Sequence, residues 1–450
     1  MNWQDLPETY NWLMQFVNYE KNTDEVKFTL DNIRILTEYF GHPEYSHRKI
    51  HVAGSKGKGS TSCFIAHLLQ EAGYKVGIYS SPHVQYFSER FVMPDGPFSP
   101  EIYQDAATEL KTGVTKLITE HKLDPQAVTW YDLVVIYGML IFRRAKVDFV
   151  VYEVGMGGRL DSTNVIMPEV SVITPIELEH TAVLGKTHAK IAREKAGIIK
   201  PGIPVVSAHQ VPSAKRVIAE TAQANQSKLI YLPDVCRISQ VKYAIISQNL
   251  QMSYHLQLFN REYQLSSQLV GNAQAENAAL AILATKQVTQ ITDKAIVAAI
   301  AAAKLPGRFE FIRGEQIGYP DIPYLIIDGA HTKASIATSI KILTQVPKAQ
   351  EAVVLFGTPK GKNITAMTAE VAKFYHDVTV TRPGDFKVSD PDVVAAAFRA
   401  QGMKAAVVPD FKQAITETLQ HASQSKRPAV FLGSLHLAGE VKKILTKSCS

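Results

Sequence analysis

A glycine-rich segment between an apolar run and a helical pattern constrains this chain more than any other feature. The segment reads Gly54-Ser55-Lys56-Gly57-Lys58-Gly59-Ser60. It follows the apolar residues 50–53 and precedes a helical periodicity over residues 60–72, with apolar side chains on one face and Gly73 at the end. The order predicts a strand, a tight turn and an amphipathic helix, then a strand over residues 75–79. Glycines let backbone N–H groups approach a phosphate, and a helix N-terminus adds partial positive charge there.

We therefore expect residues 54–60, the phosphate-binding loop, to bind a nucleoside triphosphate. Lys58 can reach the terminal phosphates, and the Ser60 hydroxyl is available to a metal ion or a phosphate oxygen. The common pattern has four residues before its Gly-Lys pair, whereas two residues separate Gly54 from Gly57 here. A glycine turn without a ligand is the alternative. The strand–turn–helix context favours the ligand, because such sheets bind ligands at the carboxyl ends of their strands.

The length of 450 residues predicts two domains, and we place them at 1–304 and 305–450 because Pro306-Gly307-Arg308 interrupts the pattern. Residues 1–200 alternate apolar strands with helices. Between residues 229 and 269, short runs with alternating polar and apolar residues suggest antiparallel strands. The expected helices are 273–285 and 293–304, and the expected strands are 149–154, 170–174, 205–207, 324–328, 352–357, 378–381, 405–408 and 429–432. This alternation predicts an α/β fold with parallel sheets.

Composition excludes several classes of protein. Hydrophobic residues make up 46% of the chain and charged residues 20%, which is typical of a globular enzyme. The net charge of +6 suits anionic substrates, but no stripe of Lys and Arg points to nucleic acid. No run of about 18 apolar residues predicts a membrane span. The polar N-terminus predicts no signal peptide, and Cys63, Cys236 and Cys449 have no zinc spacing, so we expect the cytoplasm.

Three polar side chains follow expected strands. Glu153 ends the strand 149–154, Ser81 follows the strand 75–79, and His180 follows the strand 170–174. Because parallel strands end at one edge of a sheet, we expect the three to converge. A carboxylate at such a place is costly unless it is paired or binds a metal, so Mg²⁺ is favoured over three structural side chains.

Two further segments contain polar side chains whose role the sequence pattern alone does not decide. Lys195, within residues 192–200, has the pattern of a surface ion-pair residue. The segment Asp328-Gly329-Ala330-His331 has the pattern of a tight turn after a strand.

Taken in order, the motifs resemble those of folylpolyglutamate and dihydrofolate synthases, which belong to the Mur ligase superfamily. The matching segments are 51–60, 81–83, 153–161, 180–187, 194–198, 306–308, 328–331 and 433–435. The resemblance spans nearly the whole chain. It implies a Mur-ligase-like fold, with an ATP-binding domain that carries a parallel sheet and a small antiparallel subsheet, followed by a smaller Rossmann-like domain that binds glutamate.

The resemblance also implies an ATP-dependent amide ligase that joins L-glutamate to a folate through an acyl phosphate. It implies Mg²⁺, in two ions, a carbamylated Lys195, small-molecule substrates and a monomer. Whether dihydropteroate is also an acceptor stays open.

The same resemblance implies roles for individual residues. Those implied to bind ATP are Gly54, Ser55, Lys56, Gly57, Lys58, Gly59, Ser60, Asn277, Arg308 and Asp328. Those implied to bind the pterin substrate or the amino acid are Thr129, Trp130, Tyr131, Asp132, Leu160, Asp161, Ser162 and Ser434. Ser81, Glu153 and His180 match metal ligands, and Lys58, Lys195 and His331 match catalytic residues.

Several positions depart from the family pattern. Ser55 and Lys56 stand where the family has Thr and Asn. The other departures are Tyr131-Asp132 for Phe-Glu, Thr332-Lys333 for Asn-Pro, and His436 for Tyr. Two alternatives therefore stand beside a folate ligase: a related ligase with another carboxylate acceptor, and an ATP-binding protein without ligase activity.

Overall fold

The structure is a computed structural model that describes residues 3–18, 28–246, 248–385 and 387–448. Met1, Asn2 and Cys449 lie outside these residues. The contacts divide the chain into two compact units. The first comprises Met1–Ser239, His255–Leu265 and Ala273–Ala303, and the second comprises Gln240–Tyr254, Ser266–Asn272 and Lys304–Ser450. The expected domain boundary between residues 304 and 305 stays a prediction.

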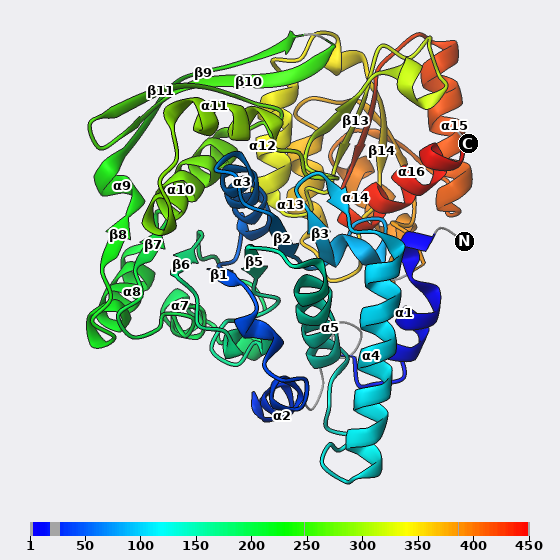
Figure 1. The fold of residues 1–450 in the computed structure, drawn as a ribbon. Coiled ribbons are helices and arrows are strands. Elements are labelled where there is room, and N and C mark those ends of the chain that lie inside the picture. Colours follow the sequence, from blue (N-terminus) through cyan, green and yellow to red (C-terminus); the bar gives the residue numbers. More distant parts are fainter. Residues whose placement is uncertain (1–2, 19–27, 247, 386, 449–450) are drawn as a thin grey trace. The chain divides into compact units, whose positions relative to one another are not determined.

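An eight-stranded, mostly parallel sheet is the framework of the first unit (Figure 1). Its order is β4-β3-β2-β5-β1-β6-β7-β8. The strands are β1 (Arg48–Ala53), β2 (Val76–Tyr79), β3 (Phe91–Met93), β4 (Gly96–Pro97), β5 (Phe149–Glu153), β6 (Val170–Ile173), β7 (Val205–Ser207) and β8 (Leu229–Tyr231). The antiparallel pairs are β2 with β3 and β3 with β4, at one edge of the sheet. The four strands expected in this region beyond the loop are confirmed to within one residue at each end.

Helices flank this sheet, and α4 packs against α5 beside it. The helices of this part of the chain are α1 (Pro7–Leu13), α2 (Asp31–Tyr39), α3 (Lys58–Glu71), α4 (Pro100–Thr119), α5 (Trp130–Ala145), α6 (Thr181–Leu184), α7 (His188–Ala196), α8 (Pro212–Ala224), α9 (Leu232–Val235), α10 (Asn272–Val288) and α11 (Asp293–Ala302). Within the described residues, no helix is both long enough and apolar enough to cross a bilayer.

The helix after the phosphate-binding loop differs from the expected one. We expected an amphipathic helix, but every residue of α3 from Ser60 to Leu69 is buried. The cause is that α3 packs against β2, β5 and α11 at once, so it has no solvent face in its middle turns. Gly73 follows the helix with φ of 94°, the left-handed conformation expected of a glycine after a helix end.

A separate antiparallel sheet has the order β11-β10-β9, formed by β9 (Cys236–Ile246), β10 (Asn249–Leu258) and β11 (Arg261–Ser267). This confirms the antiparallel strands expected between residues 229 and 269 for most of that segment. The expectation is wrong for β8, which pairs parallel with β7 in the large sheet.

The second unit holds a six-stranded sheet with the order β12-β13-β17-β14-β15-β16. Its strands are β12 (Glu310–Ile312), β13 (Leu325–Asp328), β14 (Val353–Phe356), β15 (Asp377–Val380), β16 (Lys404–Val407) and β17 (Ala429–Leu432), and its helices are α12 (Lys333–Leu343), α13 (Ile364–Val371), α14 (Pro391–Ala400), α15 (Phe411–Gln424) and α16 (Leu435–Ser448). The five expected strands are confirmed to within one residue. The sheet is mixed because β12, which was not expected, pairs antiparallel with β13. The expected α/β fold class is confirmed.

Candidate functional site

The phosphate-binding loop has a conformation that requires glycine at two positions. Gly54, directly after β1, has φ of 150°, and an added Cβ would lie 1.8 Å from Oγ1 of Thr174. Gly57 is the N-cap residue of α3 with φ of 86°, and a Cβ there would lie 2.5 Å from Oδ1 of Asn277. Side chains at these positions would clash and strain the backbone. Asn277, implied by the resemblance to contact ATP, therefore lies against the loop.

Contacts with the segment after β6 fix the start of the loop. The backbone N–H groups of Ser55 and Lys56 donate to the carbonyl oxygen of Pro175 over 2.9 and 3.2 Å. The Ser55 hydroxyl donates to the carbonyl oxygen of Glu177 over 3.1 Å. Helix α3 has no side-chain cap at its N-terminus. Its first N–H groups have no partner within the helix, which makes this end of α3 suitable for an anion.

Two lysines converge on one carbonyl oxygen of the loop. Lys195 donates from Nζ to the carbonyl oxygen of Gly54 over 2.7 Å, and Lys58 donates to the same oxygen over 3.1 Å. Lys195 is 1% exposed. The interpretation of Lys195 as a surface residue is wrong, because the turn of α7 that carries it packs under the loop.

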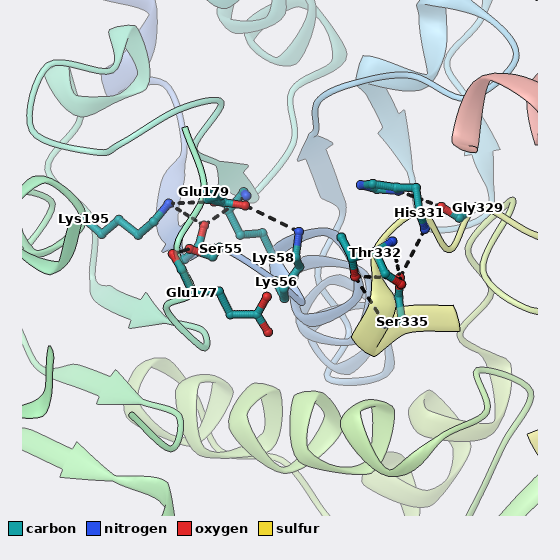
Figure 2. A network of polar contacts seen from close by, with 11 residues as sticks. Ser55, Lys56, Lys58, Glu177, Glu179, Lys195, Gly329, His331, Thr332 and Ser335 are labelled. Atoms are coloured by element: carbon teal, nitrogen blue, oxygen red, sulfur yellow. Dashed lines mark hydrogen bonds and ion pairs between the residues drawn. The ribbon is translucent and has the colours of Figure 1, made fainter. Parts of the chain in front are cut away.

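Glu179 joins these lysines, as Figure 2 shows. Its Oε1 lies 3.3 Å from Nζ of Lys195, and its Oε2 lies 3.5 Å from Nζ of Lys56. Sequence reasoning did not include Glu179 among the site residues. The available signal was its place after a strand, next to His180.

These contacts change the acid–base properties of the site. Burial, assisted by the charge of Lys58, lowers the pKa of Lys195 to about 8. Burial raises the pKa of Glu179, but Lys58, Lys195 and Lys56 together outweigh burial and lower it. Glu179 is therefore a carboxylate at neutral pH, and Lys195 gives up its proton more readily than an ordinary lysine.

The candidate metal ligands follow neighbouring strands. The order β2-β5-β1-β6 places Ser81, Glu153, the phosphate-binding loop and His180 at successive strand ends of one sheet edge. Glu153 is the last residue of β5 and is 5% exposed, and His180 is the N-cap residue of α6. Within the described residues, no group of three or more His, Cys, Asp and Glu side chains is arranged to hold a metal ion. A hydroxyl, a carboxylate and an imidazole still supply donors that Mg²⁺ accepts alongside water and phosphate oxygens, and their role stays a prediction.

Part of the expected substrate site is a buried polar network around the start of α5. Thr129 caps this helix and donates to Oδ2 of Asp132 over 2.8 Å. Ser162 donates to Oδ1 of the same carboxylate over 2.5 Å. Asp132 is 3% exposed, and its carboxylate is engaged by the protein.

A second carboxylate, Asp161, organises the glycine turn after β5. Its Oδ2 accepts from the N–H groups of Gly155 and Met156, each over 3.0 Å, and its Oδ1 accepts from Thr163. Tyr131 lies 3.5 Å from the same oxygen. The remaining expected residues are Trp130 and Leu160. Trp130 is buried and faces Arg90, with 4.8 Å between the guanidinium carbon and the ring centroid. Leu160 packs against a buried hydrophobic cluster that includes Leu133 and Tyr137. The substrate roles of these residues stay predictions.

The expected residues of the second unit lie around the end of β13. Asp328, the last residue of that strand, accepts from the N–H of Phe309 over 3.4 Å and from the Ser339 hydroxyl. Arg308 lies close enough to lower the pKa of Asp328 electrostatically, although burial raises it overall. His331 donates from Nδ1 to the carbonyl oxygen of Gly329 over 2.8 Å.

Ser434 belongs to the same edge of that sheet. Asp328 pairs with Leu432 across β13 and β17, so His331 and Ser434 both follow neighbouring parallel strands. Thr332, one of the departures from the family pattern, is the N-cap residue of α12 and accepts from the N–H of Ser335 over 3.2 Å.

Comparison with known proteins assigns the chain to a family. The family model of the Mur ligase middle domain matches residues 52–285, and that of the Mur ligase glutamate ligase domain matches residues 307–435. A dihydrofolate synthase/folylpolyglutamate synthase of Bacillus subtilis is 33% identical over 359 residues, covering 78% of this chain and 80% of that protein. The chain belongs to the folylpolyglutamate synthase family. It is an ATP-dependent ligase of the Mur type.

Other members of the folylpolyglutamate synthase family match along nearly their full length. Folylpolyglutamate synthase of Lacticaseibacillus casei is 33% identical over 425 residues, covering 93% of this chain and 95% of the relative. Its apo structure has a TM-score of 0.83 with 29% identity, and covers 99% of this chain and 100% of that one. The Mycobacterium tuberculosis enzyme complexed with ADP has a TM-score of 0.85 with 26% identity, and covers 98% of both chains.

Proposed function

We propose that this protein adds L-glutamate to a folate, using ATP to activate a carboxylate of the acceptor as an acyl phosphate. The observation that carries the proposal is the convergence of Lys58, Lys195 and the α3 N-terminus at the phosphate-binding loop, within the fold of a folylpolyglutamate synthase. A similar structure is that of a folylpolyglutamate synthase complexed with ADP, which supports nucleotide binding by this chain.

In the first step, a carboxylate oxygen of the folate attacks the γ-phosphorus of ATP, and the bond from that phosphorus to the β,γ-bridging oxygen breaks. ADP leaves and an acyl phosphate remains. Negative charge spreads over the phosphoryl oxygens during transfer. Lys58 and the N–H groups at the start of α3 would neutralise that charge.

In the second step, the amine of glutamate attacks the acyl carbon. The carbon–oxygen bond to phosphate breaks, an amide forms, and the amine nitrogen loses a proton. His331 and Ser434 follow neighbouring strands and would lie near the amino acid or the departing phosphate. With Nδ1 of His331 donating to Gly329, Nε2 is the acceptor nitrogen of the neutral ring.

Ser81, Glu153 and His180 would hold Mg²⁺, with further positions filled by water and phosphate oxygens. When bound, the ion offsets phosphate charge and aligns the reacting oxygens. The proposal includes two Mg²⁺ ions, as the family resemblance implies.

Lys195 would carry a carbamate. Its neutral amine adds to CO₂ and releases one proton, which converts a cation into an anionic oxygen ligand. The buried position and the pKa of about 8 favour this reaction, because only the neutral amine is nucleophilic.

The test is ADP release by the purified protein. We expect release only when a folate, L-glutamate and Mg²⁺ are all present, with one phosphate formed per ADP. Dihydropteroate replaces the folate in a second arm, which decides whether the chain also makes dihydrofolate. No folate-dependent release would remove the folate assignment.

A ligase with another acceptor is the second candidate, favoured by the departures at Asp132, Thr332 and Lys333. A screen of carboxylate acceptors and amino acids in the same assay separates the two. The few cysteines of the chain are consistent with our proposal that the enzyme works in the cytoplasm.

A further inference from the structure

Glu179 lies among the lysines of the nucleotide site, and no step of the proposed ligation uses it. Its two carboxylate oxygens contact different lysines, with Oε1 3.3 Å from Lys195 and Oε2 3.5 Å from Lys56. Figure 2 shows the carboxylate reaching both ammonium groups, with Lys58 beside them. The Glu179 side chain is 18% exposed, so water screens these pairs less than at the surface.

The charges around Glu179 do not balance. Before Lys195 is carbamylated, Lys56, Lys58 and Lys195 bring three positive charges and Glu179 brings one negative charge. The N-terminus of α3, which has no side-chain cap, adds partial positive charge next to them. A second anion is therefore favoured at this place, and a triphosphate is an anion of that kind. The Glu179 carboxylate and the nucleotide phosphates would therefore compete for the same lysine ammonium groups.

We propose that Glu179 is a positioning residue that acts as an internal anion. In the chain with an unmodified Lys195, it pairs with Lys56 and Lys195 before the nucleotide arrives, and these ammonium groups pass to the phosphates when the nucleotide binds. This inference rests on the proposed nucleotide site. Its consequence is that Glu179 keeps the lysines aligned but lowers the affinity for triphosphates, because breaking its ion pairs opposes binding.

Lys56 gives the inference a second test. Its side chain is 39% exposed, and its Nζ lies 3.5 Å from Oε2 of Glu179. A lysine here can either neutralise Glu179 or contact phosphate. The effect of Lys56 on nucleotide affinity should therefore depend on whether Glu179 is present.

The experiment is calorimetric titration of the full chain with the non-hydrolysable analogue AMPPCP, with ADP and with adenosine. EDTA is present, so that the lysines are measured without a metal ion. We expect Glu179→Gln to bind AMPPCP about tenfold more tightly than the wild type, since a charge is removed a few ångströms from the phosphates. ADP should gain less, and adenosine should not change. If Glu179 had only a structural role, its substitution would not change the affinities for the three ligands in the order of their phosphate number.

Glu177→Gln is the matched control. Glu177 lies two residues earlier in the same segment, its side chain is exposed, and it contacts the loop through its backbone carbonyl. The substitution removes the same charge, but from an exposed position where water and salt screen it, so the AMPPCP affinity should stay within about twofold of the wild type. Lys56→Asn should weaken AMPPCP binding more in the Glu179→Gln background than in the wild type.

Glu179→Asp keeps the charge but withdraws it by one methylene group, and it carries the test if Glu179→Gln does not fold. AMPPCP binding tighter than wild type supports the inference, and equal or weaker binding overturns it.

If the wild type binds no AMPPCP, the nucleotide site itself fails and the inference falls with it. A repeat with Mg²⁺ completes the test, because an affinity loss of Glu179→Gln seen only with Mg²⁺ would make Glu179 a metal ligand and overturn the inference.

Discussion

Gly54 contributes a carbonyl oxygen that accepts from both Lys58 and Lys195. That oxygen fixes two ammonium groups beside the phosphate-binding loop without a carboxylate on the loop itself. The arrangement suits a site whose main ligand is an anion, since a carboxylate there would repel phosphate.

Replacement of Lys58 by alanine tests the main phosphate contact. We expect ADP release to fall at least about 100-fold, because a charge-assisted contact to a phosphoryl group in transfer is lost. Steady-state assays of ADP release measure this. Lys116→Ala, which removes an exposed lysine from α4, is the control and should keep full activity. Retained activity in Lys58→Ala would refute the assigned role.

Replacement of Lys195 by alanine tests the carbamate. We expect lower activity that small carboxylates such as acetate or formate partly restore, because they can fill the space of the lost anionic ligand. Lys195→Arg keeps a cation but cannot form the carbamate, and should be inactive without rescue. Equal activity of Lys195→Ala and the wild type would discard the carbamate.

At the scale of elements, the turn between β1 and α3 depends on glycine. Gly57→Ala would place a Cβ 2.5 Å from the Asn277 side chain at a φ of 86°. We expect AMPPCP affinity to fall at least about tenfold, since the strain of about 1 kcal/mol is joined by a clash that moves the loop. Gly73→Ala is the control, because its φ of 94° brings the same strain with no heavy atom within 4 Å of the new Cβ. It should lower stability and leave AMPPCP affinity unchanged.

The strand β1 also carries a buried histidine that should make the first unit sensitive to acid. Nε2 of His51 lies 2.9 Å from the Thr163 hydroxyl, and its buried Nδ1 has no hydrogen-bond partner in the described structure. Burial lowers the pKa of His51 to about 3. Below pH 6.5 the unfolded chain binds a proton that the folded chain does not bind until about pH 3. The free energy of unfolding therefore falls as the pH drops through that window.

His51→Asn removes this contribution. Between pH 7.5 and pH 5.0 we expect the variant to lose about 2 kcal/mol less stability than the wild type. Urea titrations of the first unit's unfolding at the two pH values measure the difference. His121→Asn changes an exposed side chain and is the control. An identical pH dependence in His51→Asn and wild type would contradict the assignment.

Local pattern predicts the strands well and the environment of the helices less well. The strands of both α/β sheets have apolar runs that any parallel sheet would bury, so their positions follow from composition. Helix α3 is buried because α11, more than 200 residues later, covers it, and no local periodicity records that. Lys195 and Glu179 illustrate the same limit, since only tertiary packing brings a lysine of α7 beneath a loop after β1.

At the scale of the whole molecule, metal removal should stop the reaction. EDTA should abolish ADP release, and added Mg²⁺ should restore it, because the phosphate charge and the alignment of reactants depend on the ion. Thermal unfolding with and without EDTA checks that the fold persists. Full activity in EDTA would overturn the metal site at Ser81, Glu153 and His180.

We also expect one copy of the chain to be the active species. Light scattering during size-exclusion chromatography should give a mass near 49.7 kDa across the concentrations used for the assays. A mass near twice that value, with activity rising more steeply than protein concentration, would contradict a monomer.

The contact between Lys195 and the carbonyl oxygen of Gly54 spans 141 positions of the chain. A nascent polypeptide that has emerged only as far as β5 already has the loop and α3 but lacks the lysine and the glutamate that secure them. Truncations that stop before residue 195 should therefore capture no nucleotide, and ligand would protect the chain from proteases only once synthesis has passed α7.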